Sequence, residues 1–210
     1  MRSSRLMASP ADAFDRRNLL TYVSLLCGVG AIAGANGGQA PIAGFLIAAA
    51  VIADTFDGRF ARRFGNDPRR RALGVELDSL ADAVAFGIAP PLCAALLLHA
   101  EMDARGAALW GAAFVHAACA ITRLASYNVD AAEPARSGFI GIPVPLAALI
   151  WATALLVQPS AATTIGVILV TAAAMVLPLR VPRPTGAGLV AFTCWPVAVA
   201  LGHFAFRIWH

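Results

Sequence analysis

The sequence predicts an all-α membrane protein, a polytopic bundle of six to seven transmembrane helices. Of its 210 residues, 59% are hydrophobic and only 13% are charged, and the mean hydropathy is +0.72. Soluble domains carry roughly 25% charged residues, so this composition suits a bilayer. Because each span needs roughly 20 apolar residues, a chain of this length accommodates six or seven spans in a single domain.

Seven apolar segments separated by short polar loops are the expected spans. They cover residues 18–35, 41–62, 75–99, 106–127, 141–157, 161–178 and 186–206. Arg residues are concentrated in alternate loops, at 63–74, 128–140 and 179–185. By the positive-inside rule, these loops and the N-terminus face the cytoplasm. Seven spans then place the C-terminus outside, an orientation that Arg207 near that end opposes.

The stretch before the first span is polar and basic. Residues 1–17 are expected to form an N-terminal cytoplasmic or interfacial segment, and residues 18–210 one membrane domain. Within the first stretch Arg residues are interspersed with Leu6, Met7 and Phe14. This pattern is compatible with an amphipathic helix on the membrane surface and equally with a basic tail. A cleavable signal peptide is not expected, because the first fifteen residues are polar.

Charge and cysteine usage argue against two other classes of protein. The net charge of +4 does not predict a nucleic-acid partner, because the Arg residues lie in short loops between apolar runs rather than along one stripe. The four Cys residues are isolated within apolar runs, without the spacing of a zinc site. They are expected to be small buried side chains.

Four Asp residues are expected to converge at the cytoplasmic boundary of the membrane. Asp54 and Asp57 are three residues apart at the end of the second segment, and Asp78 and Asp82 are four apart at the start of the third. On helices, each pair shares one face. Carboxylates grouped in a membrane are costly and repel one another, penalties that divalent cations relieve. All-oxygen ligands favour Mg²⁺, Mn²⁺ or Ca²⁺ over zinc or copper.

Two alternatives to a catalytic metal site stay open at this point. The Asp residues could instead form ion pairs with Arg59, Arg62 and Arg63 in a solvated helix–loop–helix. The protein could also transport divalent cations. A transport path, however, needs ionisable groups through the whole membrane depth, whereas the outer halves of these segments are almost purely apolar.

The residues around the carboxylates form a longer pattern. Asp54-x-x-Asp57-Gly58-x-x-Ala61-Arg62, followed by Gly74-x-x-x-Asp78-x-x-x-Asp82, resembles the signature of the CDP-alcohol phosphotransferase family. Eleven residues, 63–73, separate the two halves, which is longer than the usual interval. We expect the extra residues to lie in the loop between the helices, where insertions are best tolerated.

Within that family the chain is most similar to the phosphatidylserine synthases, the CDP-diacylglycerol–serine O-phosphatidyltransferases. The similarity rests on residues 74–90, on Asn18 to Thr21, on Arg123 to Asn128 and on residues 138–145. Ser126 stands where this branch usually has a second Arg. The resemblance favours serine as the acceptor. The missing Arg, which could have paired with an acceptor carboxylate, leaves glycerol 3-phosphate or an inositol phosphate as the alternatives.

The resemblance also implies cofactors and roles for individual residues. The four Asp residues would hold two divalent cations, Mg²⁺ or Mn²⁺, on the diphosphate of CDP-diacylglycerol, and Asp82 would be the catalytic base. Nucleotide and phosphate contacts are expected from Gly58, Ala61, Arg62 and Gly74, and from Asn18 and Thr21 unless these two cap a helix. Contacts with the acceptor alcohol are expected from Ser79, Arg123, Asn128 and Arg136, unless Ser79 bonds only within its own helix.

The family resemblance implies a homodimer in a cell membrane of bacterial or archaeal type. The active site would face the cytoplasm, where a lipid-borne donor meets a water-soluble alcohol. Membrane lipid, rather than nucleic acid, is the expected surrounding.

Overall fold

The computed structural model describes residues 14–64, 67–101, 103–131, 139–181 and 187–209. They form α1 (Leu19–Asn36), α2 (Ala40–Ala61), α3 (Pro68–Asp82), α4 (Ala89–Leu97), α5 (Ala104–Ala131), α6 (Val144–Leu155), α7 (Ala161–Val176) and α8 (Ala187–Trp209). Two short 3₁₀ helices, η2 (Arg16–Asn18) and η3 (Arg62–Phe64), flank α1 and α2, and a π-helix, η4 (Ala83–Ile88), joins α3 to α4. The predicted all-α class is confirmed. One antiparallel pair of two-residue strands, β1 (Phe139–Ile140) and β2 (Arg180–Val181), accompanies the helices.

The seven predicted apolar segments each coincide with helix. Within the described ranges, five helical stretches are long and apolar enough to cross a membrane: Arg16–Asn36, Ala40–Phe64, Pro68–Leu97, Ala104–Asp130 and Val190–Ile208. The last expected span is among them. Helices α6 and α7 are also apolar but shorter, at 12 and 16 residues. The protein is therefore a polytopic helical bundle built for a membrane.

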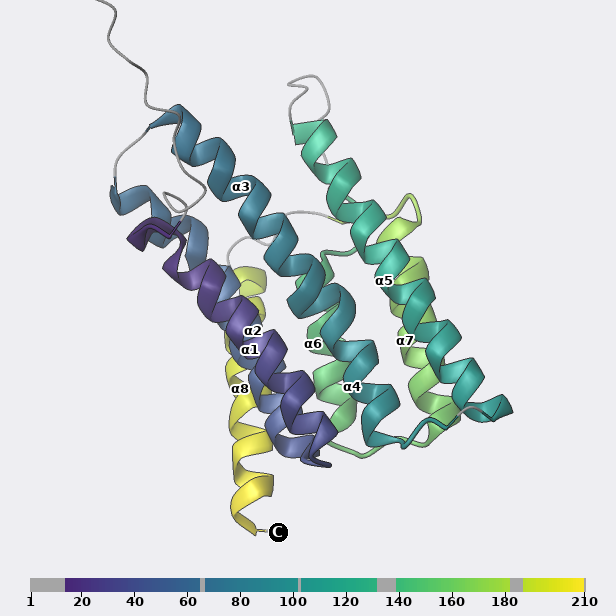
Figure 1. The fold of residues 1–210 in the computed structure, drawn as a ribbon. Helices are drawn as coiled ribbons and strands as arrows, with labels where there is room; N and C mark the ends of the chain where they lie inside the picture. The colour runs from purple at the N-terminus through teal and green to yellow at the C-terminus, as the bar shows by residue number, and fades with distance from the viewer. Residues whose placement is uncertain (1–13, 65–66, 102, 132–138, 182–186, 210) are drawn as a thin grey trace, which may run out of the picture.

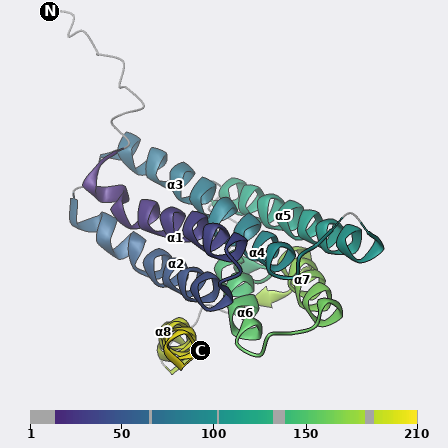
Figure 2. The ribbon, with the colours of Figure 1, turned by 60° about the horizontal axis from the view of Figure 1, so that its bottom comes forward.

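The helices are arranged so that distant parts of the chain share one end of the bundle. In Figure 1, α1, α2 and the α3–α4 rod run side by side, and α5 runs beside α7. Helix α5 also packs on η4 and α4, and α6 packs on α2 and α7. Figure 2 shows α8 on the outside of the bundle, where it packs mainly on α2. The start of α1, the end of α2 and the start of α3 lie together at the same end.

The third helix begins earlier than predicted. We expected residues 63–74 to be a loop, but α3 starts at Pro68. The Asp67 side chain accepts a hydrogen bond from the Arg69 N–H at 3.1 Å and so caps the helix, and Pro suits the first helical position. The expectation that the long interval lies wholly in a loop was therefore wrong, because part of it lengthens α3.

The α3–α4 rod is not a uniform α-helix. The π-helix η4 follows Asp82 directly and leads into Pro90 and Pro91. Proline has no N–H, and its ring clashes with the carbonyl four residues before it, so a wider turn at this point relieves the crowding. A π-turn within an α-helix frequently marks a functional site.

Candidate active site

Three of the four predicted carboxylates meet in one cluster. Asp54 of α2 and Asp78 and Asp82 of α3 each offer a carboxylate oxygen, and these oxygens lie within 4.8 Å of one another. Asp82 is buried and the other two are half-buried. The convergence predicted from the three- and four-residue spacings is therefore present in the folded chain.

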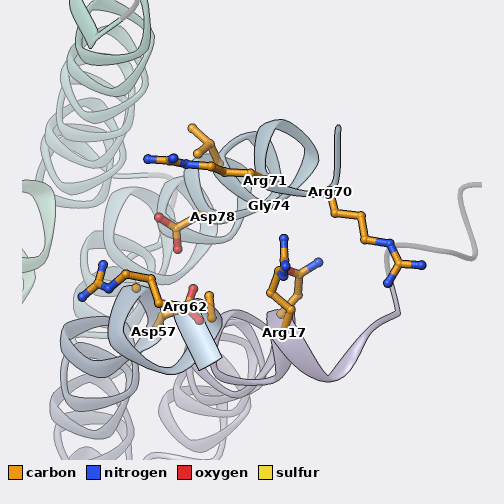
Figure 3. A pocket seen from close by; sticks show the side chains of 11 residues that line it. Arg17, Asp57, Arg62, Arg70, Arg71, Gly74 and Asp78 are labelled. Carbon is orange, nitrogen blue, oxygen red and sulfur yellow. The ribbon is translucent and has the colours of Figure 1, made fainter. Parts of the chain in front are cut away.

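Asp57 lies beside this cluster, and one of its two carboxylate oxygens has no hydrogen-bond partner. Its Oδ2 accepts a hydrogen bond from the Thr21 hydroxyl of α1 at 2.6 Å. Its Oδ1 is buried and has no hydrogen-bond partner. Figure 3 shows the Asp57 and Asp78 carboxylates turned toward the same space. A buried polar atom without a partner costs roughly 1–3 kcal/mol, and this oxygen is available to a cation.

A cavity of about 600 Å³ opens next to the carboxylates. It is lined by residues from η2, α2, η3 and α3, with several Arg side chains among them (Figure 3). The lining residues are Arg17, Asn18, Asp57, Gly58, Ala61, Arg62, Arg70, Arg71, Gly74, Val75 and Asp78. The lining thus includes six residues that the sequence signature predicted to bind the nucleotide or metal, and Asn18.

Sequence reasoning missed Arg17 as a lining residue. Arg17 is buried, and its Nη2 donates to the Phe64 carbonyl at 3.1 Å, which joins η2 to η3. The signal was available, since Arg16 and Arg17 directly precede the first span. It was interpreted only as part of the basic N-terminal segment.

The ion pairs of the described ranges do not involve the four Asp residues. Arg70 pairs with Asp15 at 2.9 Å and with Asp67 at 3.5 Å, and its side chain is largely exposed. Figure 3 shows Arg70 directed away from Asp57 and Asp78. The alternative in which neighbouring Arg side chains neutralise the carboxylates is therefore not the arrangement in the structure.

The small residues of the signature allow close approach of backbone and side chains. A Cβ at Gly74 would lie 3.3 Å from Asn18 Oδ1, and one at Gly58 would lie 3.6 Å from Arg62 Nη1. The side chain of Asn18 makes no capping hydrogen bond to α1, which removes capping as its role. Thr21 lies inside α1 and bonds Asp57 instead of a helix end.

The residues predicted to contact the acceptor lie on α3 and α5. Asn128 Nδ2 donates to Ser79 Oγ at 2.9 Å, so Ser79 is bonded across the two helices rather than only within its own. The Arg123 guanidinium lies 5.9 Å from the centre of the Tyr127 ring and is within electrostatic range of Asp82. Its buried Nε has no hydrogen-bond partner. Arg136 lies outside the described residues.

The donor set of this site fits a divalent cation. It consists of carboxylate oxygens, the hard ligands that Mg²⁺ and Mn²⁺ prefer. One of these oxygens is buried without a partner, and three carboxylates are close enough to share an ion. The cluster is therefore compatible with divalent-metal binding.

Comparison with known families identifies the group to which this site belongs. The sequence model of the CDP-alcohol phosphatidyltransferase family matches residues 17–180. This chain belongs to that family. The matched region contains all four Asp residues, every residue that lines the cavity, and Arg123 and Asn128 on α5.

The chain is also similar to individual proteins named CDP-diacylglycerol–serine O-phosphatidyltransferase. It is 40% identical to one from Mycobacterium leprae over 135 residues, which cover 62% of this chain and 43% of the relative. It is 35% identical to one from Helicobacter pylori over 133 residues, which cover 63% and 54%. A protein of Methanocaldococcus jannaschii is 35% identical over 105 residues, covering 50% and 46%. The aligned part thus spans about half the length of these relatives.

Proposed function

We propose that this membrane protein is a transferase that moves the phosphatidyl group of CDP-diacylglycerol to the hydroxyl of serine and releases CMP. The observation that carries the proposal is the cluster of Asp54, Asp78 and Asp82 beside a cavity lined by Arg side chains. The family membership supports the donor chemistry, and the names of the relatives support serine as the acceptor.

The donor half of the reaction uses the cavity. Arg17, Arg62 and Arg71 supply positive charge for the diphosphate, and Gly58, Ala61 and Gly74 leave room for the cytidine. When bound, two Mg²⁺ or Mn²⁺ ions would neutralise charge on the diphosphate as it is attacked. Asp54, Asp57, Asp78 and Asp82 would hold them. Thr21 orients Asp57 through its hydrogen bond, and Asn18 borders the nucleotide.

The acceptor half uses the side of the cluster that faces α5. Asp82 takes the proton from the serine hydroxyl, whose oxygen forms a bond to the lipid-side phosphorus. The bond from that phosphorus to the oxygen of CMP breaks, and CMP carries away that electron pair. Arg123, near Asp82, is suited to an anionic group of the acceptor, and the Ser79–Asn128 pair borders the same space. Arg136 is proposed as a further acceptor contact.

The site is proposed to face the cytoplasm in a cell membrane of bacterial or archaeal type. Basic residues gather at its end of the bundle, in η2, η3 and the start of α3, in agreement with the positive-inside rule. Lipid tails would leave between helices into the bilayer, while CMP and serine exchange with water. Residues 18–210 are proposed to act as one membrane domain, with residues 1–17 at the interface, and a homodimer is proposed from the family.

The test is an assay of CMP release by the protein purified in detergent with CDP-diacylglycerol and Mn²⁺ or Mg²⁺. Serine, glycerol 3-phosphate and inositol 1-phosphate are supplied in separate reactions. We expect CMP and phosphatidylserine with serine alone. Turnover with a phosphorylated acceptor and not with serine would move the protein to another branch of the family. No CMP with any of the three would overturn the proposed transfer.

A further inference from the structure

The Phe86 carbonyl of the π-helix η4 has no donor within its own helix. In an α-helix the Phe86 C=O accepts from residue 90, and in a π-helix from residue 91. Both residues are proline, and neither carries an N–H. Phe86 is fully buried, and an unpaired buried carbonyl costs free energy comparable to a lost hydrogen bond. The Phe86 carbonyl therefore needs a hydrogen-bond donor from another helix.

His116 of α5 is placed to donate a hydrogen bond to the Phe86 carbonyl. The side chain is buried, and its Nε2 lies 3.4 Å from the Phe86 oxygen. Its Nδ1 lies 3.4 Å from the Ile168 oxygen of α7 and 3.5 Å from Thr171 Oγ1. Ile168 lies within α7, where its carbonyl accepts from the N–H of residue 172, so it has another donor. The proton of a neutral imidazole is consequently assigned to Nε2, where Phe86 needs it.

Close packing holds η4 on two further sides. A Cβ at Gly28 of α1 would lie 2.7 Å from the Ala85 Cα, and a Cβ at Gly87 would lie 3.0 Å from the Ala120 Cβ of α5. These contacts set the distance between η4 and its neighbours, but they do not fix the helical winding of η4. The hydrogen bond from His116 can fix the winding, because it joins one particular carbonyl of η4 to α5.

We propose that His116 is a positioning residue for the carboxylate cluster. By donating to the Phe86 carbonyl it holds the winding of η4, and η4 begins at the residue after Asp82. A change in that winding rotates Asp82, and with it Asp78 one turn earlier, relative to Asp54 on α2. The inference rests on the proposed function only in that the cluster is taken to bind a divalent cation.

The test compares two nearly isosteric substitutions, His116→Met and His116→Gln, by the binding of Mn²⁺ alone. Glutamine retains an N–H donor and methionine does not. Bound Mn²⁺ is measured by electron paramagnetic resonance on detergent-purified protein, with the melting midpoint recorded in parallel. Loss of an outer partner of metal ligands typically weakens metal binding by 10–100-fold. We expect about a tenfold weaker affinity for His116→Met and a change of less than about threefold for His116→Gln.

His203 provides the matched control. It is also a buried histidine, and its Nε2 lies 2.8 Å from the Ala152 carbonyl oxygen, but it lies on α8 away from η4. His203→Gln and His203→Met should change the melting midpoint and leave Mn²⁺ affinity unaltered. If His116→Met alone does not fold, it is combined with Pro90→Ala, which restores an N–H within reach of the Phe86 carbonyl. This double variant should fold and bind Mn²⁺ as the unaltered protein does, and weakened binding by it would overturn the positioning role.

The outcomes separate this inference from the proposed function. The positioning role is supported if the unaltered protein binds Mn²⁺, if His116→Met binds it more weakly, and if His116→Gln retains the unaltered affinity. If the unaltered protein and the two single His116 variants bind Mn²⁺ with equal affinity, the positioning role is overturned and the proposed function stays intact. Equal weakening by the His116 and His203 variants also overturns it, because a general loss of packing would then explain both. No Mn²⁺ binding by the unaltered protein overturns both proposals.

Discussion

The two ends of the bundle each have a cavity, and their linings differ. The cavity beside the carboxylates has about 600 Å³ and is lined by two Asp and four Arg side chains. The one at the opposite end has about 720 Å³, between the α1–α2 turn and the ends of α4, α6 and α8. Among the described residues that line it, Arg207 is the one with a charged side chain, and it donates to Gln39 Oε1 at 3.0 Å.

The two linings show that cavity volume alone does not identify the functional end of the bundle. The larger cavity is lined by aliphatic, aromatic, proline and amide side chains and by one Arg, without a carboxylate among the described lining residues. The smaller one combines carboxylates, cations and glycines, the groups that metal ions and phosphates require. We therefore expect large effects from substitutions at the carboxylate end of the bundle and almost none at the opposite end.

The largest effect is expected for Asp82→Asn. The substitution keeps the shape of the side chain but removes the carboxylate proposed to accept the proton, and general-base catalysis is typically worth 10²–10⁴-fold. CMP release with serine should fall by about 10³-fold. An unchanged melting midpoint in detergent should show that the protein is folded. Activity within tenfold of the unaltered protein would remove Asp82 from the role of base.

A smaller loss is expected for Arg62→Gln, with Arg63→Gln as its neighbour control. Arg62 lines the cavity and Arg63, also exposed, does not. Hydrogen bonds to charged groups contribute roughly 1.5–3 kcal/mol, so the KM for CDP-diacylglycerol should rise about 30-fold for Arg62→Gln. The same kinetic titration should give a KM within about twofold for Arg63→Gln. Equal effects in the two variants would mean that only the overall charge of this end matters.

A more moderate effect is expected for Thr21→Val. The hydroxyl that donates to Asp57 is lost, and a metal ligand without its outer partner typically binds about tenfold more weakly. Mn²⁺ titration by electron paramagnetic resonance measures the change. Thr55→Val is the control, because Thr55 lies beside Asp54 on α2 but donates to the Val51 carbonyl. If both variants weakened Mn²⁺ binding alike, Thr21 would have no special part in orienting Asp57.

The smallest effect is expected at the opposite end. Arg207→Gln removes the charge of the larger cavity, far along the bundle from the carboxylates. The kcat and KM for CMP release should stay within about twofold, as for most surface substitutions away from special features. A loss approaching that of Asp82→Asn would show that the two ends are coupled or that the site has been misplaced.

Much of the fold could be predicted because the apolar segments are long and their ends are polar. The carboxylate cluster could be predicted too, since helical spacing brings Asp78 and Asp82 onto one face. The start of α3 was missed although Asp67 and Pro68 together are a helix-start signal. That signal was outweighed by the run of Arg residues after it, which resembles a loop.

Other features depend on contacts that sequence spacing does not encode. The Ser79–Asn128 pair joins residues 49 positions apart, and His116 meets Phe86 across 30 positions. The π-helix could have been suspected from Pro90 and Pro91, but its winding depends on a donor from α5. Arg17 reaches the cavity because η2 turns against η3. The sequence shows two Arg residues before the first span, but it does not show this contact.

The most direct test of the central claim is the number of Mn²⁺ ions bound at the carboxylate end. Detergent-purified protein and the Asp54→Asn/Asp78→Asn/Asp82→Asn triple variant are titrated with Mn²⁺, and free Mn²⁺ is measured by electron paramagnetic resonance. The account predicts about two tightly bound ions per chain for the unaltered protein and none for the triple variant. Equal Mn²⁺ binding by the two proteins, or no tight binding by either, would contradict it.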